Sequence, residues 1–308
     1  MKILLLGSNG QVGWELQRAL APLGEITAPT RTETGGLCGD LTRPDLLAAT
    51  VRQVAPDVIV NAAAYTAVDQ AESEPELAHA VNATAPGILA AEAQTLGAWL
   101  VHYSTDYVFD GTGTRPWRED DQTAPLNVYG RTKRDGEQAI RESGCRHLIL
   151  RTSWVYASRG RNFIRTMLRL AVERDALQVI DDQFGAPTGA ELIADTTAQI
   201  LSQPLDPAEI GGLYHLAAAG ETTWHGFARL VIATARDAGW PVRVADQAIQ
   251  AVPTEVFPTA ARRPGNSRLN CTKLETTFGL RIPDWRGGAL RALDEILACK
   301  APATGGNA

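Results

Sequence analysis

Tyr129 and Lys133 stand four positions apart in the segment NVYGRTK, residues 127–133. If this segment is helical, the two side chains lie one turn apart on the same face. A phenol with a pKa near ~10 is a poor proton donor at neutral pH, and a neighbouring ammonium lowers that pKa. The spacing therefore suits a tyrosine that gives a proton to a substrate, although such pairs also arise by chance on helix surfaces.

Two hydroxyls precede this pair in the segment VHYSTDYVFDG, where Ser104 and Thr105 end an apolar run. Ligands of doubly wound sheets bind at the carboxyl ends of the strands, so both hydroxyls are expected to face the site. One reaction that would need such a group is hydride reduction of a ketone, because the alkoxide it leaves must receive a proton. We therefore predict three catalytic residues: Tyr129 donates the proton, Lys133 lowers its pKa and Thr105 donates to the carbonyl oxygen.

A glycine-rich loop follows the first apolar run in LLLGSNGQVGWEL, with Gly7, Gly10 and Gly13 spaced three apart. Glycines allow the backbone to approach a pyrophosphate, and a helix N-terminus supplies free N–H groups and partial positive charge. Because strand, turn and helix coincide here, we predict a dinucleotide site rather than a plain tight turn. Its residues would be Gly7, Gly10, Gln11, Val12 and Gly13.

The elements that must position these residues alternate along the first half of the chain. Apolar runs alternating with amphipathic helices predict an α/β fold, a Rossmann doubly wound parallel sheet with a smaller C-terminal substrate-binding domain. The expected strands are Lys2–Leu6, Glu25–Ala28, Val58–Asn61, Trp99–Ser104 and His147–Arg151, and the expected helices are Val12–Ala21, Leu46–Val54, Glu76–Thr95, Val128–Glu142, Phe163–Arg174 and Trp224–Ala238. We assign residues 1–151 to the nucleotide-binding domain, with segments near 177–203 returning to it, residues 152–300 mainly to the substrate domain, and residues 301–308 to a disordered tail.

Composition excludes several classes of protein. A net charge of −6 with no basic stretch argues against a nucleic-acid partner, and no apolar run is long enough to cross a membrane. The four cysteines are scattered, which favours reduced thiols in a cytoplasmic protein over a zinc site or disulfides. The apolar start MKILLL resembles a signal peptide, but it stops at Leu6 before the glycine loop, so we interpret it as a buried strand.

The glycine spacing resembles the extended branch of the short-chain dehydrogenase/reductase superfamily, whose Ser/Thr–Tyr–Lys set matches Thr105, Tyr129 and Lys133. The resemblance implies a nicotinamide cofactor, NADPH or NADH, with Lys133 also holding the nicotinamide ribose. It adds cofactor contacts in CGDLTRP and NAAAYTAVDQAE and at the strand before Thr105, which are Asp40, Leu41, Ala64, Tyr65, Thr66 and Tyr103. Domains selective for NADH place an acid at the end of the second strand, where this chain has Thr30 and Arg31. If Arg31 pairs with a 2′-phosphate, the cofactor is NADPH or either nucleotide. The alternative is that Arg31 is a solvated surface residue with no role.

Longer motifs narrow the resemblance to one enzyme family within this branch. Asp106-Tyr107 replaces the Asp-Glu pair of sugar dehydratases, which argues against dehydration. RTSWVYASRGRNF, DDQFGAPTGAELIAD and ARRPGNSRLN resemble the dTDP-4-dehydrorhamnose reductases, and the resemblance runs from Met1 to about Arg291. It implies reduction at C4 of dTDP-4-dehydro-β-L-rhamnose, the last step of dTDP-L-rhamnose synthesis for cell-surface polysaccharide such as O-antigen.

The resemblance also implies substrate contacts at Thr105, Asp106, Tyr129 and Trp154, although Trp154 could instead pack in the core. Arg262, Arg263 and Asn266 are candidates for the diphosphate, unless these arginines are simply exposed and inert.

Some members of the family are magnesium-linked dimers, which implies a carboxylate ligand at Glu191, with Asp294 and Glu295 available on the last helix. A homodimer with Mg²⁺ at its interface is the corresponding prediction. Two alternatives to a reductase remain open on the sequence, a nucleotide-sugar epimerase with permanently bound NAD and a non-catalytic binding subunit.

Overall fold

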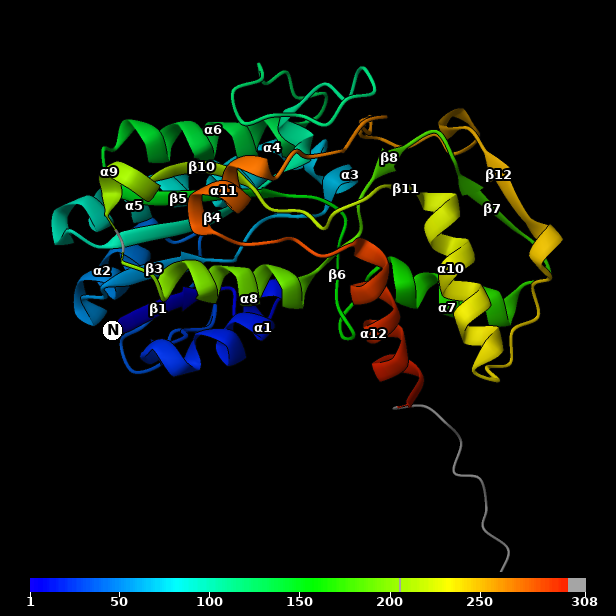
Figure 1. Ribbon diagram of the computed structural model, residues 1–308. Helices are drawn as coiled ribbons and strands as arrows, with labels where there is room; N and C mark the ends of the chain where they lie inside the picture. Colours follow the sequence, from blue (N-terminus) through cyan, green and yellow to red (C-terminus); the bar gives the residue numbers. More distant parts are fainter. Residues whose placement is uncertain (205, 299–308) are drawn as a thin grey trace, which may run out of the picture.

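The computed structural model describes residues 1–204 and 206–298. Its centre is a six-stranded sheet in the order β10-β5-β4-β3-β1-β2, in which every pairing is parallel (Figure 1). The strands are β1 (Lys2–Leu6), β2 (Glu25–Thr27), β3 (Val58–Asn61), β4 (Trp99–Thr105), β5 (Arg146–Thr152) and β10 (Gly212–His215). The chain changes direction across the sheet between β1 and β3, which is where ligands bind in open parallel sheets.

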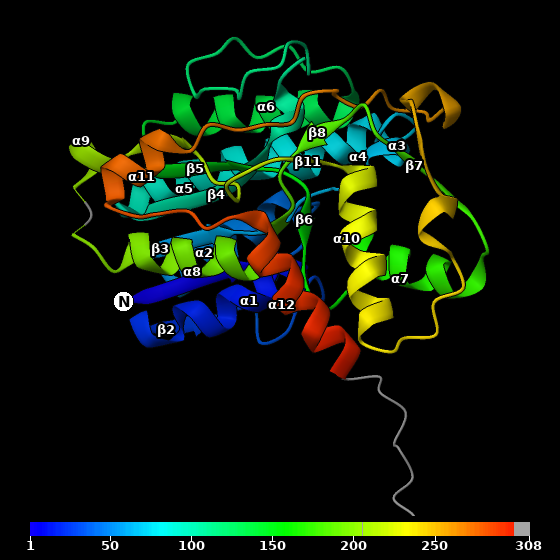
Figure 2. The same ribbon diagram turned by 45° about the vertical axis from the view of Figure 1, so that its right-hand side comes forward.

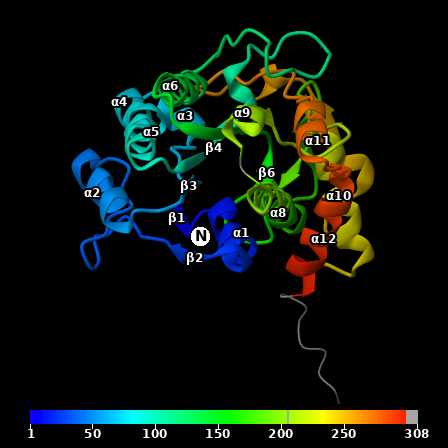
Figure 3. The same ribbon diagram turned by 60° about the vertical axis from the view of Figure 1, so that its left-hand side comes forward.

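Helices cover both faces of this sheet, as the doubly wound pattern predicts. One face carries α1 (Gln11–Leu20), α8 (Ala190–Leu201) and α11 (Thr272–Phe278), and the other carries α2 (Pro44–Val54), α5 (Ala85–Leu96) and α6 (Val128–Glu142). In Figure 3, α2 and α5 lie on one side of the strands and α8 on the other. The strands are apolar on both sides because neither face meets water.

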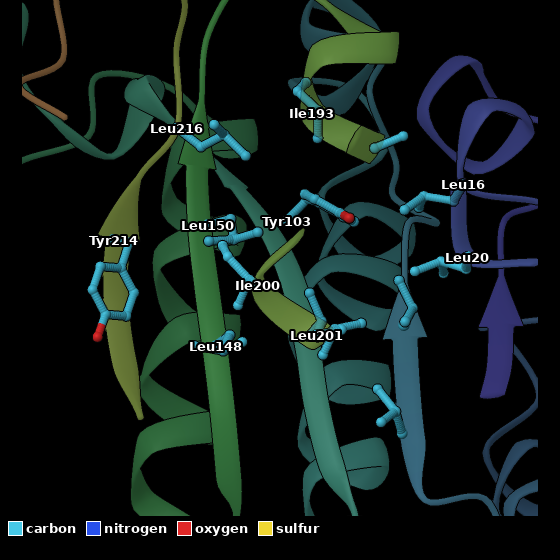
Figure 4. Packing of buried hydrophobic residues seen from close by; sticks show 14 of the residues in the cluster. Leu16, Leu20, Tyr103, Leu148, Leu150, Ile193, Ile200, Leu201, Tyr214 and Leu216 are labelled. Atoms are coloured by element: carbon cyan, nitrogen blue, oxygen red, sulfur yellow. The ribbon is translucent and has the colours of Figure 1, made fainter. Parts of the chain in front are cut away.

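Alternation along the strands divides the buried side chains between these two faces. On β1, Ile3 and Leu5 pack with α1 and α8, whereas Leu4 and Leu6 pack with α2 and α5. Figure 4 shows the first of these layers, in which Leu16 and Leu20 of α1 and the α8 residues approach the strands.

A second group of elements packs beside the sheet (Figure 2). Helices α7 (Phe163–Glu173), α10 (Trp224–Asp237) and α12 (Trp285–Ala298) share one apolar core with β7 (Leu177–Ile180) and β12 (Ile249–Val252), which pair in parallel. Two short pairs complete the group: β6 (Val155–Tyr156) with β9 (Thr188–Gly189), and β8 (Phe184–Gly185) with β11 (Thr222–Thr223).

Several predicted elements have the expected bounds to within one or two residues, and the fold class is confirmed. The predicted helix Glu76–Thr95 is instead three pieces: α4 (Pro75–His79), a π-helical turn (Ala80–Thr84) and α5. Pro86 lacks the N–H that an α-helix would need there, and the π-helical turn lies just before it. The remaining elements are short: α3 (Val68–Ala71), α9 (Pro207–Ile210) and 3₁₀ turns at Ala21–Leu23, Asp106–Val108, Asp246–Ala248 and Thr254–Val256.

The division into two domains at residue 151 stays a prediction. Of the segments expected to return to the first domain, α8 packs against α1, whereas β7 pairs with β12 and not with the six-stranded sheet. The predicted tail, residues 301–308, lies outside the described residues. Cys38, Cys145 and Cys271 are free thiols. Within the described ranges, no helix combines the length and apolar character needed to span a membrane.

Candidate active site

The glycine loop lies at the carboxyl end of β1, beside β3. Gly7 has a φ of +80°, and a Cβ there would stand 2.6 Å from the backbone nitrogen of Ala63. A Cβ on Gly13 would stand 2.0 Å from the carbonyl oxygen of Gly7. The loop is therefore compact because both positions lack side chains, and it leaves the N-terminus of α1, which begins at Gln11, beside the switch point.

We expect Gly13→Ala to raise the Kd for NADPH by about tenfold or more, the equivalent of ~1.4 kcal/mol. The added methyl group would displace the Gly7 carbonyl and distort the start of α1. Fluorescence titration of the purified protein measures the change. Gly287→Ala, on α12 with nothing within 4 Å of the added atom, is the matched control and should leave the Kd unchanged. Equal affinities for both variants would contradict a cofactor site at this loop.

The other predicted cofactor residues lie in loops at the same edge of the sheet. Thr30, Arg31 and Thr66 are exposed, and Asp40 is half-buried with its Oδ1 accepting hydrogen bonds from the N–H and hydroxyl of Thr42. In the same loops, Leu41 is buried, Ala64 is half-buried, and the Tyr65 hydroxyl donates to Glu74 at 2.7 Å. Val12 lies on α1 and packs against the core.

Local hydrogen bonds place Tyr129 at the start of α6. Asn127 caps the helix by accepting from the N–H of Gly130 at 2.8 Å, and Glu72 accepts from the N–H of Val128 at 2.7 Å. A Cβ at Gly130 would stand 2.1 Å from the Tyr107 carbonyl oxygen, so only glycine permits this close approach. The helix therefore holds Tyr129 against the turn that follows β4.

Thr105 and Asp106 lie beside Tyr129. The Thr105 hydroxyl donates to Oδ1 of Asp106 at 3.1 Å, and the other carboxyl oxygen of Asp106 is buried without a hydrogen-bond partner among the described residues. Burial raises the pKa of Asp106 to about 6 and that of Tyr129 to about 12, the latter partly offset by hydrogen bonding with Thr105. The three groups form a small, poorly solvated polar centre at the end of β4.

Lys133 is buried one turn further along α6, and its Nζ donates to the Tyr103 carbonyl oxygen at 2.6 Å. Nζ also lies 3.0 Å from Nε2 of His102. Burial lowers the pKa of Lys133 to about 8. In this arrangement the groups that act on the pKa of Tyr129 are Thr105 and Asp106, so the predicted tuning by Lys133 stays a prediction.

The expectation that Ser104 faces the site is wrong. Its hydroxyl donates to Oε1 of Glu137 at 2.5 Å, on the face of the sheet that α6 covers. Successive side chains of a strand point to opposite faces, so Ser104 and Thr105 cannot share one. Tyr103 shows the same alternation, because its hydroxyl pairs with Thr197 of α8 at 2.8 Å while only its carbonyl meets Lys133.

Trp154 lies just after β5 in a conformation that few residues adopt. Its φ is +49°, and its ring stacks on Trp224 with centroids 3.7 Å apart. A Cβ at Gly185 would stand 2.8 Å from the Trp154 ring, so this neighbour must be small. Left-handed backbone at a bulky residue concentrates at functional sites, where surrounding contacts hold it in place.

Trp224 and Arg263 line a cavity of about 300 Å³ beside this stack, together with Tyr107, Phe163, Gln183 and Phe257, among others. The sequence alone did not point to Trp224, because a tryptophan opening an amphipathic helix gives no signal of a site. The cavity joins the turn after β4 to the second group of elements.

The three residues predicted to hold a diphosphate lie in different surroundings. Arg262 is exposed, and Arg263 forms a bidentate ion pair with Asp69, with both nitrogen–oxygen distances at 2.5 Å. Asn266 is buried, and its amide nitrogen donates to the carbonyls of Thr112 and Arg115, which fastens two loops together. Their role toward a phosphate stays a prediction.

Glu191 lies on α8 and accepts from Arg291 of α12 at 2.7 Å. Among residues 1–204 and 206–298, no group of three or more His, Cys, Asp or Glu side chains is arranged to hold a metal ion. An arginine therefore occupies the place where the prediction put a cation, and these residues of one chain do not fit a magnesium site.

Comparison with known proteins shows the family to which the chain belongs. The family model described as RmlD substrate binding domain matches residues 1–298. The chain is 56% identical over 301 residues to a dTDP-4-dehydrorhamnose reductase of Escherichia coli strain K12, covering 98% of this chain and 100% of that protein.

Solved structures of the same kind of enzyme also resemble this chain. Crystal structures of dTDP-4-dehydrorhamnose reductases from Clostridium acetobutylicum and from Bacillus anthracis, the latter in complex with NADP, are each 34% identical and superpose with TM-scores of 0.85 and 0.84. Each match covers 96% of this chain and 99% of the other. The chain therefore belongs to the dTDP-4-dehydrorhamnose reductase family.

Proposed function

We propose that this protein reduces the C4 keto group of dTDP-4-dehydro-β-L-rhamnose to give dTDP-L-rhamnose, the last step in supplying that sugar for cell-surface polysaccharide. The observation that carries the proposal is the meeting of Thr105, Asp106 and Tyr129 at the end of β4. This centre lies at the same sheet edge as the glycine loop and beside an aromatic cavity, which supports a hydride acceptor held between a dinucleotide and a bulky ligand.

The nicotinamide cofactor, when bound, supplies the hydride that adds to C4. The former carbonyl oxygen then carries negative charge, and Tyr129 gives it the phenolic proton, leaving a phenolate and the neutral alcohol product. Lys133, as an ammonium turned toward Tyr129, stabilises that phenolate. Thr105 donates to the substrate oxygen once its hydroxyl turns from Asp106, which can accept from a hydroxyl of the substrate. A tyrosine whose pKa is about 12 gives up its proton only to a stronger base, and an alkoxide is one.

The experiment is to mix the protein with NADPH or NADH and the 4-keto sugar and to follow the loss of nicotinamide absorbance. Decay at the rate of product formation supports a reductase, whereas no decay with either cofactor would refute the proposal. An epimerase would instead release tightly bound NAD on denaturation and consume no added cofactor.

We infer that NADPH is the preferred cofactor. Arg31 is exposed in the loop after β2, where a guanidinium can reach a 2′-phosphate, and the related Bacillus anthracis structure is a complex with NADP. The assay above, run with NADPH and with NADH at matched concentrations, decides between the two.

The remaining predictions follow from the family. We propose a cytoplasmic protein that acts on a small nucleotide sugar rather than on nucleic acid or a membrane. A homodimer stays a prediction. Magnesium is not needed for any step above, and the pairing of Glu191 with Arg291 gives no support for it within one chain.

Trp154→Ala should raise the KM for the nucleotide sugar about 10- to 100-fold, because a large aromatic contact of ~1.5–3 kcal/mol is lost. The ring stacks on Trp224, which lines the cavity, and is not part of the glycine loop, so the Kd for NADPH should stay unchanged. Steady-state kinetics and cofactor titration measure the two quantities separately. A variant with a normal KM would assign Trp154 to packing alone.

A further inference from the structure

Three buried polar side chains meet beneath the start of α6. Asn61 ends β3, His102 lies in the middle of β4, and Lys133 reaches down from α6, and each is about 1% exposed. Nδ2 of Asn61 lies 3.1 Å from Nδ1 of His102, whose Nε2 lies 3.0 Å from Nζ of Lys133. The imidazole therefore bridges the amide and the amine, out of contact with water.

The orientation of the Asn61 amide follows from the backbone. Its Oδ1 accepts from the N–H of Ala63 at 3.2 Å, and a backbone N–H can only donate. The other end of the amide, the NH₂ group, must then face His102. Nδ1 of the imidazole is consequently a hydrogen-bond acceptor and carries no proton.

This orientation has a consequence for Lys133. A neutral imidazole with an unprotonated Nδ1 carries its proton on Nε2, which points at Nζ. An ammonium has three N–H donors and no lone pair, so it would set donor against donor at 3.0 Å. A neutral amine fits, because its lone pair accepts from Nε2–H while one of its own hydrogens is donated to the Tyr103 carbonyl.

The charged groups nearby do not reverse this preference. Glu137, one turn further along α6, favours the ammonium, but both of its oxygens are engaged by Arg151 of β5 and one also by Ser104. Burial also favours the neutral amine and lowers the pKa of Lys133 to about 8, so the amine form predominates above that pH. Burial likewise holds the pKa of His102 well below its usual range. Tyr129, the remaining titratable group one turn before Lys133, is neutral near pH 8 because its pKa is about 12.

We propose that Asn61 and His102 are positioning residues for Lys133, and that the Nε2–H tautomer of His102 favours the neutral amine of Lys133 over its ammonium. An Nζ that turned from His102 toward Tyr129 and the cofactor would lose this bias and hold its proton more tightly. The consequence for catalysis rests on the proposed function: the basic limb of the pH profile for kcat reports this amine.

Asn61→Asp reverses the tautomer with almost no change in size. A carboxylate can still accept from the Ala63 N–H, and its second oxygen accepts a proton on Nδ1 of His102, which frees the Nε2 lone pair for an ammonium. We expect the pKa of Lys133 to rise by about one unit or more, since a donor-to-donor contact becomes a charge-assisted hydrogen bond. His102→Gln should act in the same direction, because its amide can turn its oxygen toward Nζ.

The direct measurement is the pH titration of the Lys133 Cε resonance in protein labelled with [¹³Cε]lysine. The chain has few lysines, Lys2, Lys133, Lys273 and Lys300, and Lys133→Met assigns the signal. Thr197→Val is the control, since it removes the partner of the Tyr103 hydroxyl on the opposite face of the sheet and should leave the titration unchanged.

An upward shift in Asn61→Asp or His102→Gln but not in Thr197→Val supports the proposal. The same midpoint in the unmodified protein and both variants, or a Lys133 that titrates together with the exposed Lys2, would overturn it. The Lys133 resonance is measured without substrate or cofactor, so it does not depend on the proposed function. If the expected shift is seen but the protein reduces no sugar, the proposed function is refuted and this inference still holds. In an active enzyme, the basic limb of kcat should move upward with the resonance, whereas a merely structural role would lower kcat at every pH.

Discussion

Tyr129→Phe should lower kcat by about 10²- to 10⁴-fold, the usual contribution of a positioned proton donor. The variant keeps the ring, which packs edge-on against Tyr107 with centroids 5.6 Å apart, and removes only the hydroxyl, whose pKa Thr105 influences. The fold and the glycine loop are therefore undisturbed, and the Kd for NADPH should stay within a few-fold of its normal value. Turnover is measured from nicotinamide absorbance, and affinity by fluorescence titration.

Tyr214→Phe is the matched control, because it removes another buried phenolic hydroxyl, one that donates to the Ile210 carbonyl at 2.9 Å away from the site. It should leave kcat unaltered. If Tyr129→Phe turned over as fast as the unmodified protein, Tyr129 would not be the proton donor, and a non-catalytic binding subunit would become the better reading of this fold.

Arg151→Met should lower the free energy of unfolding by about 3–5 kcal/mol, the usual cost of leaving one member of a buried ion pair without its partner. Arg151 of β5 donates to both oxygens of Glu137 on α6, at 2.8 and 2.6 Å, and the two side chains are 2% and 0% exposed. Only Ser104 would then remain to hydrogen-bond the Glu137 carboxylate. Urea denaturation of both proteins measures the loss.

The double variant Arg151→Met with Glu137→Leu should recover much of that loss, because no buried charge is left unpaired. Arg169→Met is the control, since it breaks an exposed pair with Glu173 on α7 and should be nearly neutral. An Arg151→Met protein as stable as the unmodified one would mean that the buried carboxylate is satisfied in another way, and that the junction of β5 with α6 does not depend on this pair.

Local signals account for what could be predicted at the site. The helix from Val128 to Glu142 has the predicted bounds, and its start is readable in adjacent residues because Asn127 caps it. The glycine loop was predictable for the same reason, since Gly10 and Gly13 are constrained by contacts with Gly7 inside a single βα turn, whereas the contact of Gly7 with Ala63 after β3 is not visible in the local sequence.

The sequence by itself determined the fold class and the order in which Thr105, Tyr129 and Lys133 follow the glycine loop, because those features depend on the periodicity and punctuation of neighbouring residues. Only the tertiary structure decided that Ser104 turns toward Glu137, that β7 pairs with β12, that Trp154 stacks on Trp224, and that Lys133 meets His102 rather than standing free. Each of these contacts joins residues far apart along the chain or depends on which face of a strand is covered. Tertiary packing determines such contacts, and no pattern of neighbouring residues predicts them.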